Sequence, residues 1–217
     1  NAASVGIFAQ SVGGGGGYGG SMILGDHDRI GIRVLDSSAD ASGNGGAVTV
    51  DASGRITTSG DNSVGIFAQS VGGGGGVQGT VDKSSTDSSY VGSFGGTGTA
   101  GVVTVTYSGA QLATTGAGAH GIFAQYAGGE GNSGAVANTT VAVTATGSVS
   151  ATGAGAHAIH VENMGDGGGH STITIGEDAD IRGGGGAIYD NALTGAGVYI
   201  HSGSNSTLTN AGTISAV

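Results

Sequence analysis

The first candidates for chemistry are four charged residues near the C-terminal end of the sequence: Glu177, Asp178, Asp180 and Arg182. Paired carboxylates, usually beside a basic group, are what a polysaccharide-cleaving site requires. In a chain built of repeats the second carboxylate must come from the neighbouring repeat, yet the residue that aligns with Asp180 there is Ser148. We therefore interpret the four residues as solvated surface, assign no catalytic residue and expect that the chain is not an enzyme.

Two histidines occupy equivalent places in successive repeats. His120 and His157 each stand two residues before a marker isoleucine, where earlier repeats have Val5 and Val64. Imidazole nitrogens bind transition metals, but the alignment brings no third ligand to this pair. The stretch 165–169 contains one Asp among glycines but lacks the period of calcium-binding nonapeptide repeats. The sequence therefore predicts no metal site and no cofactor.

Glycine dominates the composition, with 51 glycines and no proline among 217 residues. Only 9% of residues are charged and β-branched residues recur regularly, which is not the signature of a disordered chain. The net charge of −10 argues against nucleic acid or an anionic membrane as a partner, because both attract clustered Lys and Arg. No apolar run approaches the roughly 20 residues that span a bilayer, so we expect no direct membrane insertion of this segment.

An internal repeat decides the expected fold. The segment 4–17 returns unchanged at 63–76, and a shorter copy begins at Gly121. Weaker copies follow, so that five isoleucines mark one strand of a repeating unit: Ile7, Ile66, Ile122, Ile159 and Ile188.

Two further strands precede each marker. A second strand lies ten residues upstream of it, at Ile56, Leu112 and Val149, with Ile181 only seven residues before Ile188. The third strand lies further upstream still and alternates β-branched residues with others. Its outward residues are expected to form a threonine ladder, interrupted at Ala142, whose members are Thr49, Thr104, Thr174 and Thr207. Short strands with glycine-rich corners are typical of stacked parallel coils. We therefore expect an all-β chain, a right-handed parallel β-helix with three short strands per rung, about five rungs and glycine-rich loop insertions, forming a single segment over 1–217.

Two outward columns follow from this alternation. An aromatic column is expected at Phe8, Phe67 and Phe123, continued by His160 and Tyr189. Either the adjacent glycine runs fold back over these rings, or the rings form a lateral contact with another fibre or with carbohydrate. An amide column is expected at Gln10, Gln69 and Gln125, continued by Glu162 and Asn191, with hydrogen bonds along the stack.

The two ends of the sequence are in register. If a second copy followed directly, Ile214 would precede its Ile7 by ten residues, the same spacing as from Ile56 to Ile66. This predicts copies of the chain joined end to end, either covalently in a tandem array or as stacking subunits.

The segment 6–17, its copy at 65–76 and turns such as 53–60 resemble the passenger repeats of autotransporter adhesins of Gram-negative bacteria. This resemblance implies a parallel β-helix at the bacterial cell surface, exported through the outer membrane, with no shared active-site motif. We expect a structural or adhesive fibre element with host or matrix carbohydrate or protein as further partners. The alternative is a polysaccharide-binding or polysaccharide-cleaving β-helix, which needs a groove of aligned carboxylates and aromatics.

Overall fold

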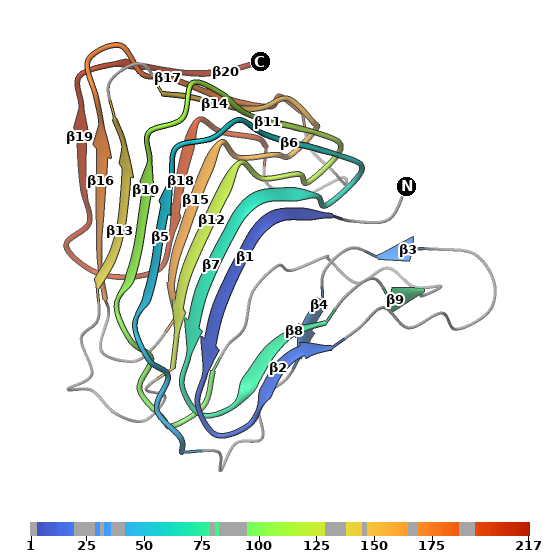
Figure 1. Cartoon of the computed structure of the whole chain (residues 1–217), viewed down its shortest axis with the longest axis vertical. Coiled ribbons are helices and arrows are strands. Elements are labelled where there is room, and N and C mark those ends of the chain that lie inside the picture. The colour runs from blue at the N-terminus through green and yellow to red at the C-terminus, as the bar shows by residue number, and fades with distance from the viewer. Residues whose placement is uncertain are drawn as a thin grey trace.

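The chain forms a three-sided parallel β-helix of about five rungs (Figure 1). The computed structural model describes residues 4–19, 29–30, 33–35, 42–78, 81–82, 95–128, 138–144, 147–164, 169–186 and 194–217, which hold strands and turns but no helix. The strands visit three faces in turn, and each face is a sheet of five parallel strands. The predicted fold class is confirmed.

The strands of each face follow in chain order. The first face holds β5 (Val48–Ala52), β10 (Val103–Tyr107), β13 (Asn138–Val143), β16 (His170–Ile175) and β19 (Thr207–Asn210). The second face holds β6 (Ile56–Ser59), β11 (Leu112–Thr115), β14 (Ser148–Ala151), β17 (Asp180–Gly183) and β20 (Thr213–Ala216). The third face holds β1 (Val5–Val12), β7 (Val64–Val71), β12 (Ile122–Ala127), β15 (Ile159–Met164) and β18 (Val198–His201).

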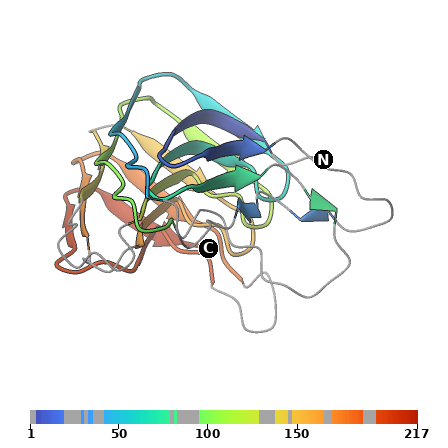
Figure 2. The same cartoon turned by 90° about the horizontal axis from the view of Figure 1, so that it is seen from below.

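Equivalent residues of successive rungs lie directly beside one another. On the third face Ile7 pairs with Ile66, Ile66 with Ile122 and Ile122 with Ile159. Figure 2 shows the resulting progression across the stack, from blue and teal at one end to red at the other. Each residue type therefore repeats as a column along the axis, and a column forms one continuous contact from rung to rung.

The core is a thin apolar column enclosed by the three faces. Alternate residues of β5 and β10 point inward and are buried, as the alternating burial along both strands indicates. Val, Ile, Leu and Ala from all three faces form one continuous cluster. Because each rung buries its apolar side chains only against its neighbours, the stack is stabilised as a one-dimensional array.

The predicted position of one strand is corrected. The fifth strand of the third face is β18, not the segment around Ile188, because Val198 pairs with Ile159 and Tyr199 with His160. Residues 184–197 lie between β17 and β18, so the chain makes a longer excursion there than the seven-residue spacing assumed. Ile188, Tyr189 and Asn191 lie outside the described residues.

The threonine ladder also has a different register. Thr104 pairs with Thr140 and Thr140 with Thr172, so the outward ladder of the first face is unbroken. Its members are Thr49, Thr104, Thr140, Thr172 and Thr207. The alignment by β-branched pattern was wrong by two residues there because Thr139 occupies the inward position that Val103 holds one rung earlier.

Two small sheets lie outside the coil. The glycine runs after β1 and β7 form the parallel strands β2 (Gly16–Gly19) and β8 (Gly75–Gln78), which turn back from the third face (Figure 1). Strand β4 (Arg33–Leu35) joins β8, and β3 (Arg29–Ile30) pairs with β9 (Val81–Asp82). The described parts of the glycine-rich insertions therefore include short strands. The described residues contain no apolar helix long enough to cross a membrane.

Glycine is required where the chain enters the third face. A Cβ added at Gly65 would lie 2.6 Å from the carbonyl oxygen of Gly121 and 2.6 Å from Leu112 Cδ2. Gly6 and Gly121 meet the same kind of obstruction, each from the backbone of the next rung and an apolar side chain of the second face. These glycines therefore set how closely successive rungs approach at this corner.

We expect Gly65→Ala to lower the free energy of unfolding by about 1–3 kcal/mol, because the added methyl group has no space between two rungs. Gly54→Ala is the matched control, since a Cβ there meets no atom within 4 Å. The control is expected to be neutral or stabilising by up to about 1 kcal/mol. Urea unfolding followed by circular dichroism measures both, and equal midpoints for the two variants would contradict the assigned role.

Candidate functional site

The outward side of the third face carries a second, smaller core. Every residue of β7 is buried, so this strand is covered on both of its sides. Val64, Phe67 and Phe123 form a separate apolar cluster there, with Val5 packed against it. Among the described residues, the stacked Phe rings, the glutamine ladder and the buried histidines lie on this outward side of the third face.

The predicted aromatic column exists, but most of it is covered by the chain itself. Phe8 stacks on Phe67 with ring centroids 5.1 Å apart, and Phe67 stacks on Phe123 at 5.0 Å. Phe67 and Phe123 are fully buried, whereas Phe8 at the end of the stack is 37% exposed. Tyr199 takes the place predicted for Tyr189. The burial favours the interpretation that the rings are covered, and a lateral contact stays a prediction that concerns Phe8 alone.

The predicted amide ladder is formed by hydrogen bonds along the axis. Gln10 Nε2 donates to Gln69 Oε1 at 2.6 Å, and Gln69 Nε2 donates to Gln125 Oε1 at 2.6 Å. Gln125 Nε2 then donates to Glu162 Oε2 at 2.7 Å. The column continues at His201, which occupies the place predicted for Asn191. The ladder is therefore a directed chain of donors that ends on a buried carboxyl group.

Glu162 is where the amide and aromatic columns meet. Its Oε1 lies 3.2 Å from His201 Nδ1 and 3.0 Å from His160 Nε2, while its Oε2 accepts from Gln125. The His160 contact is close but outside hydrogen-bond geometry. Glu162 is 1% exposed, and a buried carboxylate requires this kind of compensation by donors and cations.

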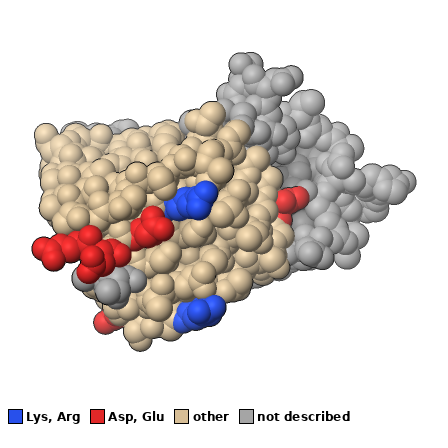
Figure 3. All heavy atoms as spheres, turned by 90° about the horizontal axis from the view of Figure 1, so that it is seen from above, with Lys and Arg blue, Asp and Glu red and all other residues tan. Residues whose placement is uncertain are grey.

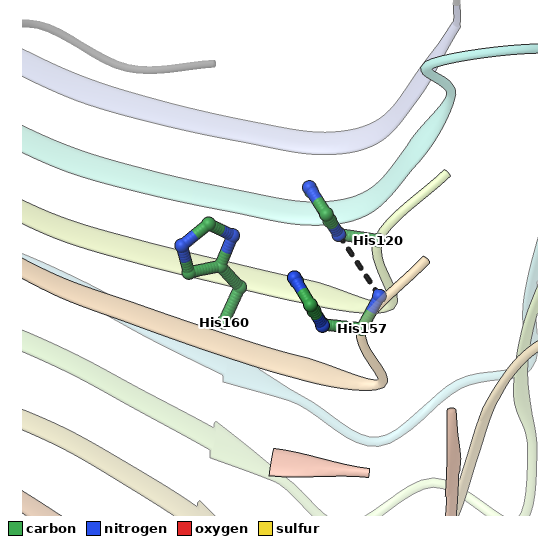
Figure 4. A group of neighbouring side chains, drawn as sticks. All are labelled: His120, His157 and His160. Atoms are coloured by element: carbon green, nitrogen blue, oxygen red, sulfur yellow. Dashed lines mark hydrogen bonds between the residues drawn. The ribbon is translucent and has the colours of Figure 1, made fainter. Parts of the chain in front are cut away.

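Three histidines form a buried cluster (Figure 4), and one of them, His160, lies 3.0 Å from Glu162. His120 and His157 come from the corners that precede β12 and β15, and their rings stack at 5.0 Å with an angle of 2° between planes. His160, on β15, is nearly perpendicular to both rings, at 4.9 Å from His120 and 5.1 Å from His157. The sequence places His160 in the aromatic column and predicts no third histidine beside the His120–His157 pair. That expectation is wrong, because the corner geometry brings His160 against both rings.

The cluster does not fit a metal ion as it is arranged. The ligand nitrogens lie within 4.8 Å of one another, but the lone pair of each nitrogen points outward within its ring plane. Since the planes of His120 and His157 are stacked and parallel, their lone pairs do not converge on one point. In addition, His120 Nδ1 accepts a hydrogen bond from the His157 backbone N–H at 3.0 Å, which leaves the proton of the neutral ring on Nε2.

Burial keeps two of these rings neutral. Removal from water lowers the pKa of His157 to about 4, and the neighbouring His160 acts in the same direction while Glu162 opposes it. Burial, followed by His160 and His157, lowers the pKa of His120 well below its ordinary value. Among the described residues, Nδ1 of His157 and Nδ1 of His160 have no hydrogen-bond partner. Protonation of either ring would therefore place a charge among buried aromatic rings, and Glu162 offsets only part of the cost at His157.

His201 has the opposite tendency. Its hydrogen bond with Glu162 is the main cause that raises the pKa of His201. Because its pKa is higher in the folded chain, His201 contributes stability at pH values below its pKa in the unfolded chain, about 6.5. That contribution is lost as the pH rises through the pKa of the folded chain. The side chain is 41% exposed, so solvent screening makes this contribution small.

No protein-family model, curated protein or solved structure matches this chain. Sequence reasoning placed the aromatic and amide columns but missed Tyr199 and His201. The signal was the alternation Val198-Tyr-Ile-His201, which has the same pattern as Ile159-His-Val-Glu162. The assembled site is a covered stack of rings beside a polarised ladder of amides that ends on Glu162.

We expect the free energy of unfolding to fall on acidification between pH 6.5 and pH 4. The unfolded chain takes up protons on His120 and His157 in this range while the folded chain does not, which costs about 1 kcal/mol per pH unit for each histidine. His157→Val, which restores the residue type of Val5 and Val64 in this column, should make the dependence shallower. Urea unfolding across this pH range tests the expectation, and an unchanged slope in the variant would contradict it.

We also expect a substitution in the middle of the amide ladder to lower the stability of the fold more than a substitution at its end. Gln69→Ala removes the partner of Gln10 Nε2 and of Gln125 Oε1, and an unsatisfied buried polar group costs about 1–3 kcal/mol. Gln10→Ala is the matched control, because it removes one hydrogen bond at a half-buried position. Thermal unfolding should show the larger loss for Gln69→Ala, and a larger loss for Gln10→Ala would count against the ladder.

Proposed function

We propose that this chain is a structural and adhesive element of a bacterial surface fibre, in which copies continue one another end to end. In this proposal the chain is exported through the outer membrane and displayed outside the cell, as the resemblance to autotransporter passenger repeats implies. The β-helix acts as a stiff spacer, and the small sheets beside the third face meet the surroundings. The observation that carries the proposal is the shape of the two ends of the stack.

Each end of the stack presents one outermost strand from each face. At one end these strands are β1 on the third face and β5 and β6 on the other two. At the other end they are β18, β19 and β20. Strand β1 of a second copy would therefore pair with β18, while β5 and β6 would pair with β19 and β20.

Among the described residues, the core side chains of the outermost strands are only partly buried. Ile7, Ala9 and Ile56 at one end are only partly buried, and so are Val198, Ile200 and Ile214 at the other. Leu208 on β19 is 44% exposed. Within the described residues no capping element covers these positions, and open strand edges above an apolar core are templates for further pairing. Stacking a copy in register would bury both sets against each other.

The described surface gives no support to polysaccharide cleavage. Glu177, Asp178 and Asp180 are exposed together on the second-face side, where Figure 3 shows acids gathered near one edge of a surface with few charges. Asp180 has Ser148 and Thr213 as its neighbours on adjacent strands, so no second carboxylate aligns with it. We accordingly propose no enzymatic activity.

Cysteine cross-linking tests the end-to-end arrangement, because the chain has no cysteine of its own. Thr57 and Ser215 are exposed at opposite ends of one column, Thr57–Ala113–Ser150–Arg182–Ser215. In a continued stack they become neighbours on adjacent strands, with Cα atoms about 4.8 Å apart, which a disulfide can bridge. Mixing Thr57→Cys and Ser215→Cys chains should give mixed dimers in preference to dimers of either variant.

Ala113→Cys is the matched control, since it lies in the same column in the middle of the stack. It should not cross-link with Ser215→Cys. The end-to-end proposal would be overturned if mixed and same-variant dimers formed in the statistical ratio. It would also be overturned if Ser215→Cys gave the same yield of mixed dimers with Ala113→Cys as with Thr57→Cys.

A further inference from the structure

The amide ladder has a fixed direction, and Glu162 sets it. A carboxylate only accepts hydrogen bonds, so Gln125 must present Nε2 to it and keep Oε1 for the preceding rung. Gln69 must then present Nε2 to Gln125, and Gln10 must present Nε2 to Gln69. Reversing any one amide would bring two oxygens together. One buried carboxyl group thus orients three amides as far as the open edge of β1.

The ladder consequently presents different groups at its two ends. At the edge of β1, the amide oxygen of Gln10 is the acceptor that remains for the next residue of the column. At the edge of β18, His201 uses Nδ1 toward Glu162, which leaves Nε2 on the other side of the ring for the following rung. An acceptor at one end and an imidazole nitrogen at the other are complementary only in a head-to-tail arrangement.

We propose that the ladder crosses the junction between copies, with Gln10 of one copy accepting a hydrogen bond from the protonated ring of His201 in the copy before it. This inference rests on the proposed end-to-end continuation and names the contact that makes it depend on pH. In the same register Phe8 of the second copy would follow Tyr199 in the aromatic column.

The charge on His201 decides whether this contact is favourable. When the ring is an imidazolium, Nδ1–H donates to Glu162 and Nε2–H donates to Gln10. When the ring is neutral and Nδ1–H still donates to Glu162, Nε2 presents a lone pair to the amide oxygen, and the two repel. Association is therefore expected to be tighter at pH 6 than at pH 9.

The described groups around His201 support this dependence. From β15, Glu162 bonds its ring and His160 contacts the same carboxyl oxygen. From its own strand, Tyr199 lies with its ring centroid 6.0 Å away. Glu162 is the acid that favours the charged ring.

The test is sedimentation velocity of the 217-residue chain at pH 6 and pH 9, compared with two variants at His201. A hydrogen bond to a charged group predicts that the wild-type chain associates about tenfold or more tightly at pH 6. His201→Lys keeps a cationic donor at both pH values, so its association should be strong at both. His201→Phe keeps a ring without a hydrogen-bond donor, so its association should be weak at both pH values. The ratio of its association constants at pH 6 and pH 9 reports the effect of overall charge.

Circular dichroism at both pH values confirms that each variant is folded. Association of His201→Phe equal to that of the wild-type chain at pH 6 would overturn the Gln10–His201 junction while leaving end-to-end continuation intact. The junction would also be overturned if the ratio of association constants at pH 6 and pH 9 were no larger for the wild-type chain than for His201→Phe. Absence of wild-type association at both pH values, together with absence of mixed Thr57–Ser215 disulfides, would instead overturn the continuation itself.

Discussion

The parallel hydrogen bonding between successive rungs is the constraint on which the rest of this structure depends. It holds each residue beside its equivalent in the next rung, as with Ile7, Ile66 and Ile122. A single favourable contact is thereby repeated along the stack, and a single unfavourable one would be repeated as well. This explains why small side chains or none are needed where the chain enters the third face, and why apolar, aromatic and amide positions each persist over several rungs.

The same constraint makes it possible to bury polar groups. A lone glutamine on a covered surface would leave part of its amide without a partner, but a column of glutamines satisfies each amide with the next. The column ends where Glu162 replaces glutamine and the histidines cluster, and there the regular repeat gives way to a local charge arrangement. Neutral His120 and His157 destabilise the fold toward acid, whereas His201 acts toward base, so the acid–base sensitivity lies in the last three rungs, at β12, β15 and β18.

The fold was predictable because the repeat is nearly exact at its start, where the segment around Ile7 recurs unchanged around Ile66. Prediction became wrong where the pattern has more than one solution. The sequence around Ile188 resembles the other marker strands, but Val198, ten residues later, is the residue that pairs with Ile159 in the stack. The threonine register was misread because Thr139 stands inward, where a valine was expected. The amide column followed from spacing alone, whereas the histidine cluster and the burial of Phe67 depend on corners and on chain outside the rungs, which periodicity does not describe.

Electron cryomicroscopy of material assembled from this chain tests the central claim, that the rungs continue in register from one copy to the next. The account predicts a continuous fibre with layers about 4.8 Å apart and an axial repeat of about 24 Å for five rungs, with no break in the layers at the junction. Separate short particles, or fibres in which the layer spacing is interrupted or the copies alternate in direction, would contradict it.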